Sequence, residues 1–563
     1  MRKTRLPDQN ACCIKTYPIG WASGALRRVE YSRTRGAASG ADGHRTTRWL
    51  TSACDPGRHQ IHPAPITAAA PDQAPAPSGA PWLARIAFGA ILALKLALLA
   101  AYGPIYTPDS GGYVAYAQAM RASTAWLHDA GLAQSAVPVL ALRMAGYPAV
   151  IAGAMALVGA AWPVAVVLVQ FALSMTAGHA LYRLAAELGL SARTALAAAV
   201  VYMLSLPLTY DQCILTDSLY ASLIVLATAA LTHGVLAKRT FSWRQGAVAG
   251  ALFVLAFLLR DSTLVLLLAF VPLIALRAWL NGAARWRQSA VAVLLLVLPL
   301  LASAELYKRW NEYRSGERFV TTVAQLTVVH GLAKTAASNP QLLSGDTPLD
   351  RVGARLFRGD PFGESVKVSN ELFAQGYAAT DIARMAFGVY FRSWRAHPAA
   401  MLHLLKRNTS ERVAKLTIRP IAAICETSEL AAGERRCYDY RTLYRAIPSG
   451  FAGLPRSAVA FFALQTLELT LAICLFALFF LGVPAMLAQA TLASGGRPDR
   501  AILTFGAFWA VYVLWHLAHA IVHMEDRYMM PVLPLSILAG LFVAVALHRR
   551  RKARTRSHAT SSA

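Results

Sequence analysis

Long apolar runs alternate with short polar segments from Trp82 onward, and this pattern predicts a polytopic membrane protein. Many runs hold roughly 20 apolar residues, which is enough to cross the hydrocarbon core of a bilayer as a helix. Helices are expected because an open sheet would leave backbone hydrogen-bonding groups unpaired in lipid. The spans are placed at 83–102, 163–183, 194–210, 216–237, 245–260, 262–281, 288–306, 457–488, 501–521 and 529–548. The predicted fold class is an all-α polytopic membrane protein of about 10–11 transmembrane helices with an outer-face loop subdomain.

The distribution of Lys and Arg between the short loops predicts the orientation. These residues are concentrated in alternate loops, which the positive-inside rule places in the cytoplasm. The opposite set is then on the outer face, and it comprises 103–162, 211–217, 260–261, 307–456 and 522–528. We therefore expect a multi-pass protein of the bacterial inner membrane with both termini in the cytoplasm.

One apolar segment does not fit this alternation. Residues 144–161 are apolar over 18 positions, yet no polar turn separates them from the next span. Counting them as a full span would move every later Arg-rich short loop to the outside. We interpret them as a re-entrant or interface-lying helix on the outer side, and Trp162-Pro163 is a candidate for the bend.

The chain divides into five regions. Residues 1–81 are Arg-rich and then Pro/Ala-rich, so they are predicted to be a disordered N-terminal tail or an over-extended start. Residues 82–306 form the N-terminal transmembrane catalytic module, and 457–548 are the C-terminal transmembrane helices. Between them, 307–456 is long enough for a periplasmic loop subdomain. Residues 549–563 are a basic cytoplasmic tail.

Composition and missing motifs exclude several function classes. The chain is 56% hydrophobic with a net charge of +26, and that charge is assigned to loops and tails that hold the topology. The alternating aromatic and basic residues of a single-strand nucleic-acid groove are absent, so nucleic acid is not an expected partner. No P-loop, dinucleotide fingerprint, H-E-x-x-H, C-x-x-C pair or D-x-D triplet is present. ATP-driven transport and nucleotide-donor chemistry are therefore not favoured.

The first candidate catalytic residue is Asp109, just after the first span in Tyr106-Thr-Pro-Asp-Ser-Gly-Gly-Tyr113. A carboxylate there can deprotonate or orient an acceptor hydroxyl or amine, and the two glycines let a ligand approach the backbone. The alternative is that Asp109 only caps the helix that carries Tyr113. Tyr113 itself is assigned to the pocket.

Other charged residues lie at the outer ends of apolar runs. Arg143 either binds the donor phosphate or snorkels at the lipid surface. Asp211 and Asp217 share a short outer loop and are candidates for an acceptor-binding or second carboxylate, with an N-cap as the alternative for Asp217. Arg260 either contacts the donor phosphate or forms a turn with an internal ion pair to Asp261.

The sharpest cluster is His523-Met-Glu-Asp-Arg-Tyr528, between two long hydrophobic runs. Charged groups gathered at one mouth of a membrane bundle are costly and are usually functional. Arg527 is the main candidate for binding phosphate, because its planar fork can hold two oxygens at once. His516, His519 and His523 share a predicted helix face, which favours a polar seam over a metal site. The pocket residues expected here are His523, Glu525 and Tyr528.

At these motifs the chain resembles the membrane glycosyltransferases of the GT-C fold, in particular the bacterial relatives of protein O-mannosyltransferases and the lipid A aminoarabinose transferase. The elements P-D-S-x-x-Y, R-x-x-G-Y-P, T-D-S-L and E-D-R-Y-x-x-P-x-x-P carry the resemblance, which covers 83–305 and 457–548. It implies a GT-C-like bundle, with Asp109 as the first-loop carboxylate and with Arg260 and Arg527 holding the phosphate of a lipid carrier. Ser110 follows Asp109 without a second acid, which departs from the mannosyltransferase pattern.

The expected function is an inner-membrane glycosyltransferase that moves a sugar from a polyprenyl-phosphate carrier to an acceptor on the periplasmic side. The leaving phosphate already carries charge, so its departure needs cationic donors more than an acid. This reaction requires no cofactor that the sequence identifies, and a divalent metal ion is left as an open alternative. The expected partners are membrane lipids, the lipid-linked donor and a glycan, lipid or protein acceptor. The alternatives are a transporter or flippase of a lipid-linked anion and a non-catalytic envelope assembly protein.

Two of the seven cysteines, Cys425 and Cys437, share the long outer loop. The predicted topology puts both in oxidising periplasm, where disulfides persist. Gly433 and several polar residues between them let the chain turn back. We therefore predict a Cys425–Cys437 disulfide, with two unpaired thiols as the alternative.

Overall fold

The computed structural model describes residues 81–107, 109–233, 243–267, 269–270, 286–413, 423–425, 437–439, 445–454, 473–493 and 500–561, with a few separate residues between 459 and 470. The tail predicted to be disordered lies outside these residues except for Pro81. Apart from two three-residue strands, the regular elements described are helices, and the predicted all-α class is confirmed.

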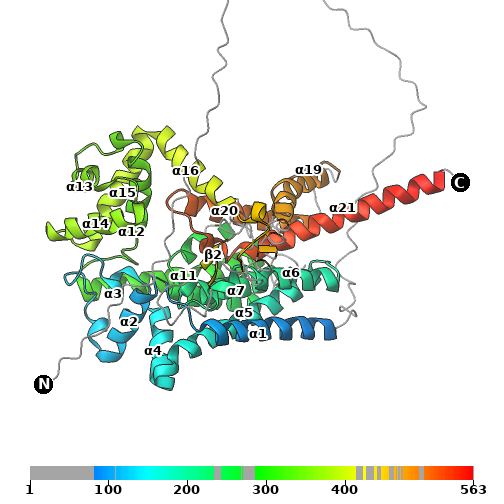
Figure 1. The fold of residues 1–563 in the computed structure, drawn as a ribbon, viewed down its shortest axis with the longest axis horizontal. Coiled ribbons are helices and arrows are strands. Elements are labelled where there is room, and N and C mark those ends of the chain that lie inside the picture. Colours follow the sequence, from blue (N-terminus) through cyan, green and yellow to red (C-terminus); the bar gives the residue numbers. More distant parts are fainter. Residues whose placement is uncertain are drawn as a thin grey trace, which may run out of the picture. The chain divides into compact units, whose positions relative to one another are not determined.

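Ten helices are described before residue 316 (Figure 1), and they share the larger hydrophobic core with residues 479–543 of the C-terminal part. The central packing is sequential: α5 contacts α6 and α8, α8 contacts α9, and α9 contacts α11. Short connections favour such neighbours. The helices are α1 Pro81–Tyr102, α2 Ser110–Ala122, α3 Val139–Leu142, α4 Gly146–Val158, α5 Trp162–Glu187, α6 Ala192–Leu204, α7 Leu206–Tyr210, α8 Thr216–Leu231, α9 Trp243–Leu259 and α11 Trp286–Ser315.

The segment that did not fit the alternation is a separate short helix. α4 has 13 residues, about 20 Å of helix, which is shorter than the roughly 30 Å hydrocarbon core. It ends at Gly159, whose φ of +57° suits glycine, and a 3-10 turn leads into α5. The bend therefore lies at 159–161, just before Trp162. α4 also approaches α9 closely, since a Cβ on Gly146 would overlap the Leu258 carbonyl oxygen.

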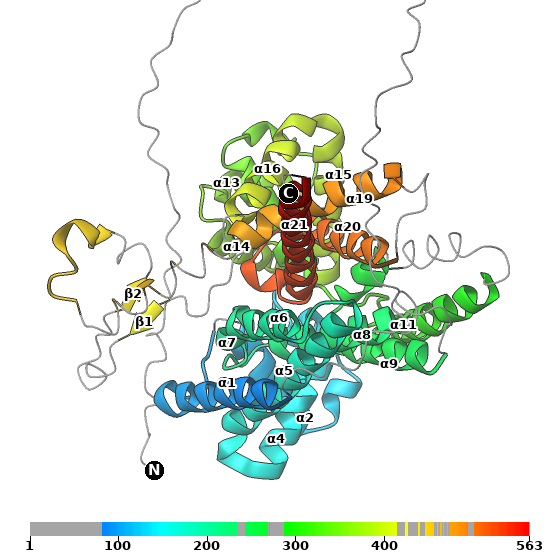
Figure 2. The ribbon, with the colours of Figure 1, turned by 90° about the vertical axis from the view of Figure 1, so that its right-hand side faces the viewer.

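Residues 324–413 form five helices with a hydrophobic core of their own. Figures 1 and 2 both show α13 to α16 lying together as one group. Their start signals are local: Thr347 and Asp350 form a capping box, and Asp360 accepts the Gly363 amide. The helices are α12 Ala324–Ala336, α13 Pro348–Leu356, α14 Pro361–Ala374, α15 Ala379–Ala396 and α16 Pro398–Val413.

This helical group is joined to the end of a long apolar helix, α20. Tyr390 donates to the carbonyl oxygen of Ile521 at 2.6 Å, and Asn408 donates to that of Ala520 at 2.7 Å. A Cβ on Gly331 would lie 2.6 Å from the Val522 carbonyl oxygen, so α12 packs against the same turn. The turn leads directly to Glu525 and Arg527.

The C-terminal part holds the π-helix η9 Leu478–Gly482, α19 Val483–Ala493, α20 Arg500–Ala520, the 3-10 turn η10 Asp526–Met529 and α21 Leu533–Ser561. A short antiparallel pair, β1 Ala423–Cys425 and β2 Cys437–Asp439, precedes it in the chain. α21 continues as a helix through most of the predicted basic tail.

Six described helices are long and apolar enough to cross a membrane, and three more are apolar but shorter. Together they overlap nine of the ten predicted spans. Most of the tenth, 262–281, lies outside the described residues, as does most of 457–472. The long helices are Trp82–Ala100, Gly146–Glu187 (which includes the Gly159 bend), Ala290–Ser315, Ile473–Leu492, Ile502–Ala520 and Leu533–Ala553.

Candidate functional site

A short backbone bridge brings two of the predicted acidic loops together. The Ile105 amide donates to the Gln212 carbonyl oxygen at 2.9 Å, and the Ile214 amide donates to the Ile105 carbonyl oxygen at 2.9 Å. The chain continues from Ile105 to Asp109 on one side of this bridge and from Ile214 to Asp217 on the other. Two carboxylates from distant parts of the sequence are thereby held in one region.

Asp109 binds two arginines. Its Oδ1 accepts from Arg143 Nη2 at 2.7 Å, and its Oδ2 accepts from Arg527 Nη2 at 2.6 Å. Asp109 does occupy the residue before α2, but its side chain makes no capping hydrogen bond. The Asp109 side chain is thus engaged by two arginines and not by the start of α2, and Arg143 is an ion-pair partner and does not simply snorkel.

Arg527 is the centre of the charged cluster. Besides Asp109, its Nε lies 2.6 Å from Glu525 Oε2 and its Nη1 lies 3.7 Å from Asp217 Oδ2. Asp217, only 3% exposed, also accepts from Arg260 Nη1 at 2.6 Å. The N-cap alternative for Asp217 is wrong because Leu215 precedes α8 as its cap residue.

The cluster of Arg143, Arg260, Arg527, Asp109, Asp217 and Glu525 balances three positive and three negative charges. Arg260 therefore does not form the internal pair with Asp261 that the turn alternative required, because its partner is Asp217. A phosphate that entered here would meet three planar forks, each already oriented by a carboxylate. Arginine forks match phosphate oxygens in geometry.

Two tyrosines line the arginines. The Arg143 guanidinium lies 4.8 Å from the Tyr113 ring centroid, and the Arg260 guanidinium lies 4.6 Å from that of Tyr528. Such contacts stabilise a cation over an aromatic face. The Tyr113 hydroxyl is also 3.4 Å from Arg143 Nη1 and from the Thr216 hydroxyl. Both predicted pocket tyrosines therefore lie in the cluster.

The charged neighbours fix the protonation states of the acids. Burial would raise the pKa of Asp109, but Arg143 and Arg527 outweigh it and hold that pKa below its usual range. Burial likewise opposes ionisation of Glu525, yet Arg527 and His523 lower its pKa well below the usual range. Both carboxylates are ionised at neutral pH, and Asp109 can accept a proton only weakly while both arginines face it alone.

The histidines are arranged differently from the predicted helix face. α20 ends at Ala520, so His523 has left the helix that carries His516 and His519. His523 Nε2 lies 2.9 Å from Glu525 Oε1, and its ring centroid lies 4.1 Å from that of His330 in α12. Within the described ranges, no group of three or more His, Cys, Asp or Glu is placed to hold a metal ion. The contacts of His523 and Arg527 thus engage the two different oxygens of the Glu525 carboxylate.

Asp211 does not make an ion pair with the site arginines. Its side chain is fully buried in an ion pair with Lys95 of α1, and Ser218 donates to it at 2.6 Å. Sequence analysis missed Lys95 and the buried Gln170 of α5. The position of Lys95 in the middle of an apolar run was the available signal for it; Gln170 gave no comparable one.

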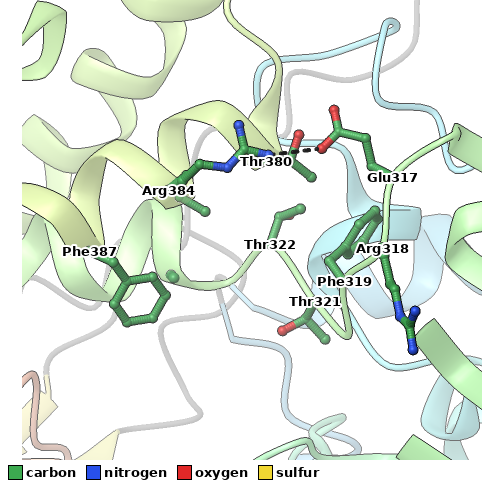
Figure 3. A pocket seen from close by; sticks show the side chains of 10 residues that line it. Glu317, Arg318, Phe319, Thr321, Thr322, Thr380, Arg384 and Phe387 are labelled. Carbon is green, nitrogen blue, oxygen red and sulfur yellow. Dashed lines mark ion pairs between the residues drawn. The ribbon is translucent and has the colours of Figure 1, made fainter. Parts of the chain in front are cut away.

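A hollow of about 270 Å³ lies beside the site, between residues 317–324 and α15 (Figure 3). Glu317 and Arg384 face each other at 3.6 Å across one end of it. The Thr321 hydroxyl, which also lines the hollow, donates to Asp261 Oδ2 at 2.6 Å. The wall of the hollow is therefore connected to the turn that carries Arg260.

No protein-family model and no curated protein matches this sequence. Among solved structures, the chain is similar to ArnT from Cupriavidus metallidurans in the apo state, with 16% identity, 78% of this chain and 77% of that chain covered, and a TM-score of 0.31. The match falls in the group that the four sequence motifs resemble. A similarity at this TM-score carries no argument about activity.

Proposed function

We propose that this protein is a membrane glycosyltransferase of the GT-C type that moves a sugar from a polyprenyl-phosphate carrier to an acceptor on the periplasmic side. The observation that carries the proposal is the position of Asp109 between Arg143 and Arg527, at 2.7 and 2.6 Å. A carboxylate that can activate an acceptor is thereby placed beside cations that can hold a phosphate. The two roles that the reaction needs are adjacent.

The arginines serve the leaving group. As the bond between the sugar's anomeric carbon and the phosphate oxygen breaks, its electron pair stays on the phosphate. Arg527, with Arg260 and Arg143, supplies fixed donors for that charge, and such donors stabilise a transition state because they need no reorganisation. Their bidentate geometry suits phosphate better than a point charge does.

Asp109 serves the acceptor. The acceptor oxygen or nitrogen forms the new bond to the anomeric carbon, and its proton passes to the Asp109 carboxylate. A bound phosphate draws the arginines toward itself and adds negative charge, and both effects raise the pKa of Asp109 toward that of a useful base. Donor binding thus prepares the base.

The direct test is transfer by the purified protein. The protein in detergent is incubated with a radiolabelled polyprenyl-phosphate sugar and bacterial envelope lipids, and label leaving the carrier is followed by chromatography. We expect wild type to release unlabelled polyprenyl phosphate and to label an acceptor, and Asp109→Asn to do neither at a comparable rate. Intact carrier after prolonged incubation with wild type would contradict the proposal.

One observation keeps a transporter or flippase of a lipid-linked anion as the second candidate. The Lys95–Asp211 ion pair is fully buried and Lys95 lies inside an apolar helix, as ionisable residues of transport paths do. The same labelled donor separates the two functions in proteoliposomes. A transporter would move the donor across the bilayer with its sugar still attached, whereas a transferase would cleave it.

A further inference from the structure

A buried ion pair fixes one end of the segment that leads to Asp217. Lys95 and Asp211 are both fully buried, and Lys95 also donates to the Ser174 hydroxyl of α5 at 3.2 Å. Removing two charges from water is costly unless further hydrogen bonds satisfy them. Ser174 and Ser218 provide such bonds here. The Asp211 side chain is therefore bound by α1 and α8, and α5 holds its partner Lys95.

Gln170 of α5 holds the same segment through its backbone. Its Nε2 donates to the carbonyl oxygens of Asp211 at 2.8 Å and of Cys213 at 3.0 Å. Its Oε1 accepts from the Tyr147 hydroxyl at 2.9 Å. Gln170 is 0% exposed, so its loss would take a buried donor away from the Asp211 and Cys213 carbonyl oxygens and loosen the segment between them.

The segment fixed by Gln170 is the one that pairs with the Asp109 loop. Ile105 exchanges backbone hydrogen bonds with Gln212 and Ile214. Asp109 lies four residues beyond Ile105, and Asp217 lies three residues beyond Ile214. A shift of residues 211–214 would therefore change the separation of the two site carboxylates, and Arg527 contacts both of them.

Gln170 also reaches the site by a second route. Tyr147, which donates to it, packs edge-to-face on Tyr113 with the ring centroids 5.2 Å apart. Tyr113 in turn lies under the Arg143 guanidinium. The glutamine thus supports both the carboxylate loops and the aromatic platform of Arg143, while its own hydrogen bonds go to none of the six charged residues of the cluster.

We propose that Gln170, backed by the Lys95–Asp211 ion pair, is a positioning residue that sets the spacing of Asp109 and Asp217 for sugar transfer. The proposal rests on the proposed function. Misplacement of a reacting group by about 1 Å can cost 100-fold in rate. Gln170→Met keeps the side-chain volume and removes every hydrogen bond, so it isolates this role.

The experiment combines kinetics with hydrogen–deuterium exchange of the detergent-solubilised full chain. For Gln170→Met we expect kcat to fall by about 10- to 100-fold, with the donor KM changed by less than about threefold, because Gln170 forms its hydrogen bonds with Tyr147 and the 211–213 backbone and with none of Arg143, Arg260 and Arg527. Exchange should become faster in peptides covering 103–109 and 211–216. Tyr147→Phe, which removes only one hydrogen bond, should give a smaller change in the same direction.

Gln325→Met is the matched control. Gln325 in α12 is equally buried, and its side-chain amide has no hydrogen-bond partner in the described part of the chain. It should leave kcat and both exchange peptides unchanged. If Gln170→Met fails to insert, Tyr147→Phe decides by the same two measurements.

Two outcomes would overturn the proposal: unchanged exchange in both peptides, or faster exchange that is spread evenly over all helices. A third result separates it from the proposed function. In this result, the wild type transfers no sugar while Gln170→Met still speeds exchange in 103–109 and 211–216. Gln170 would then support these two segments for another activity, and its assignment to sugar transfer would be overturned together with the proposed function.

Discussion

Asp109 carries the most specific expectation at the residue scale, because both of its oxygens bind arginines from distant parts of the chain. Asp109→Asn keeps the side-chain size but removes the base. It also replaces one of the two oxygens that accept from arginine with an amide group. Loss of a positioned general base typically lowers the rate by about 100- to 10,000-fold. We expect a decrease in kcat of that size, measured as labelled sugar transferred per minute.

The matched control for Asp109→Asn is Asp129→Asn. Asp129 lies in the next loop, where its carboxylate accepts from the Gly131 amide and from Gln134, both at 2.7 Å. The chemical change is the same, and the charged cluster is untouched. Turnover of Asp109→Asn within a few-fold of this control, at equal amounts of inserted protein, would remove Asp109 from the chemistry.

Arg527 is expected to hold the donor phosphate. Arg527→Lys keeps the charge but replaces a planar fork that contacts three carboxylates with a single ammonium group. A hydrogen bond to a charged group contributes about 1.5–3 kcal/mol, so the affinity for a polyprenyl phosphate should fall by about tenfold or more. Isothermal calorimetry or a fluorescent-lipid titration measures it.

Arg318→Lys controls for the Arg-to-Lys change itself. Arg318 forms an exposed ion pair with Glu305 outside the cluster, and exposed pairs contribute little. It should bind the donor like wild type. Equal affinities for Arg527→Lys and Arg318→Lys would show that the fork of Arg527 does not hold the phosphate.

The charged residues of the cluster were visible in the sequence, and the residues that support them were not. Asp109, Asp217 and Arg527 stood out because a charged residue beside an apolar run has few purely structural uses, and the structure brings the three together. Asp211 was grouped with Asp217 because the two are neighbours in sequence. In the structure they point to different partners, since Asp211 faces Lys95. Which way a side chain points from a short loop depends on tertiary packing, which spacing alone does not contain.

At the scale of elements, helix existence was predictable and helix ends were not. Nine predicted spans overlap described apolar helices, because hydrophobic length is a strong signal. The bend after α4 occurs at Gly159 and not at Trp162-Pro163, since proline is well tolerated in the first turn of a helix. The hydrogen bonds of Gln170 to the 211–213 backbone could not be predicted, because one glutamine in an apolar run forms no periodic pattern.

The β1–β2 pair gives a prediction at this scale. Its antiparallel register sets Cys425 directly opposite Cys437, as a short cross-strand disulfide requires. We expect a disulfide there, which would stabilise the loop by roughly 3 kcal/mol in the chain-entropy model. Alkylation of intact membranes before and after reduction, followed by peptide mass mapping, measures it. Two alkylated thiols before reduction would count against the bond.

At the scale of the whole molecule, the ionised cluster predicts how stability changes with pH. The folded-state pKa values of Asp109 and Glu525 lie below their usual values of 3.8 and 4.5. Groups with lowered pKa stabilise the fold above the unfolded pKa and lose that contribution as pH falls through the folded pKa. These two carboxylates should therefore contribute a constant amount to stability from about pH 5 to 8. As the pH falls below about 4, that contribution is lost and the melting temperature in detergent should decrease.

Asp109→Asn tests this pH dependence, because it removes one of the two groups. Its melting temperature should decline less between pH 5 and pH 3 than that of wild type. An identical decline in the two proteins would mean that Asp109 makes no net contribution to the acid sensitivity, despite its two short ion pairs.

The orientation of the whole chain is a prediction from its basic loops, and it decides which compartment the site faces. The positive-inside rule predicts that the loop between α5 and α6 lies in the cytoplasm and that the loop after α1 lies outside. Tyr106, 50% exposed, lies in the loop that leads to Asp109, and the exposed Arg193 lies near the start of α6. We expect Tyr106→Cys to gain labelling by a membrane-impermeant maleimide over the parent protein, in cells whose outer membrane has been permeabilised. Arg193→Cys should gain labelling only after the inner membrane is disrupted. The reverse pattern would put Asp109 and its arginines in the cytoplasm, where a carrier presented in the outer leaflet could not reach them, and the proposed donor would then have to be replaced.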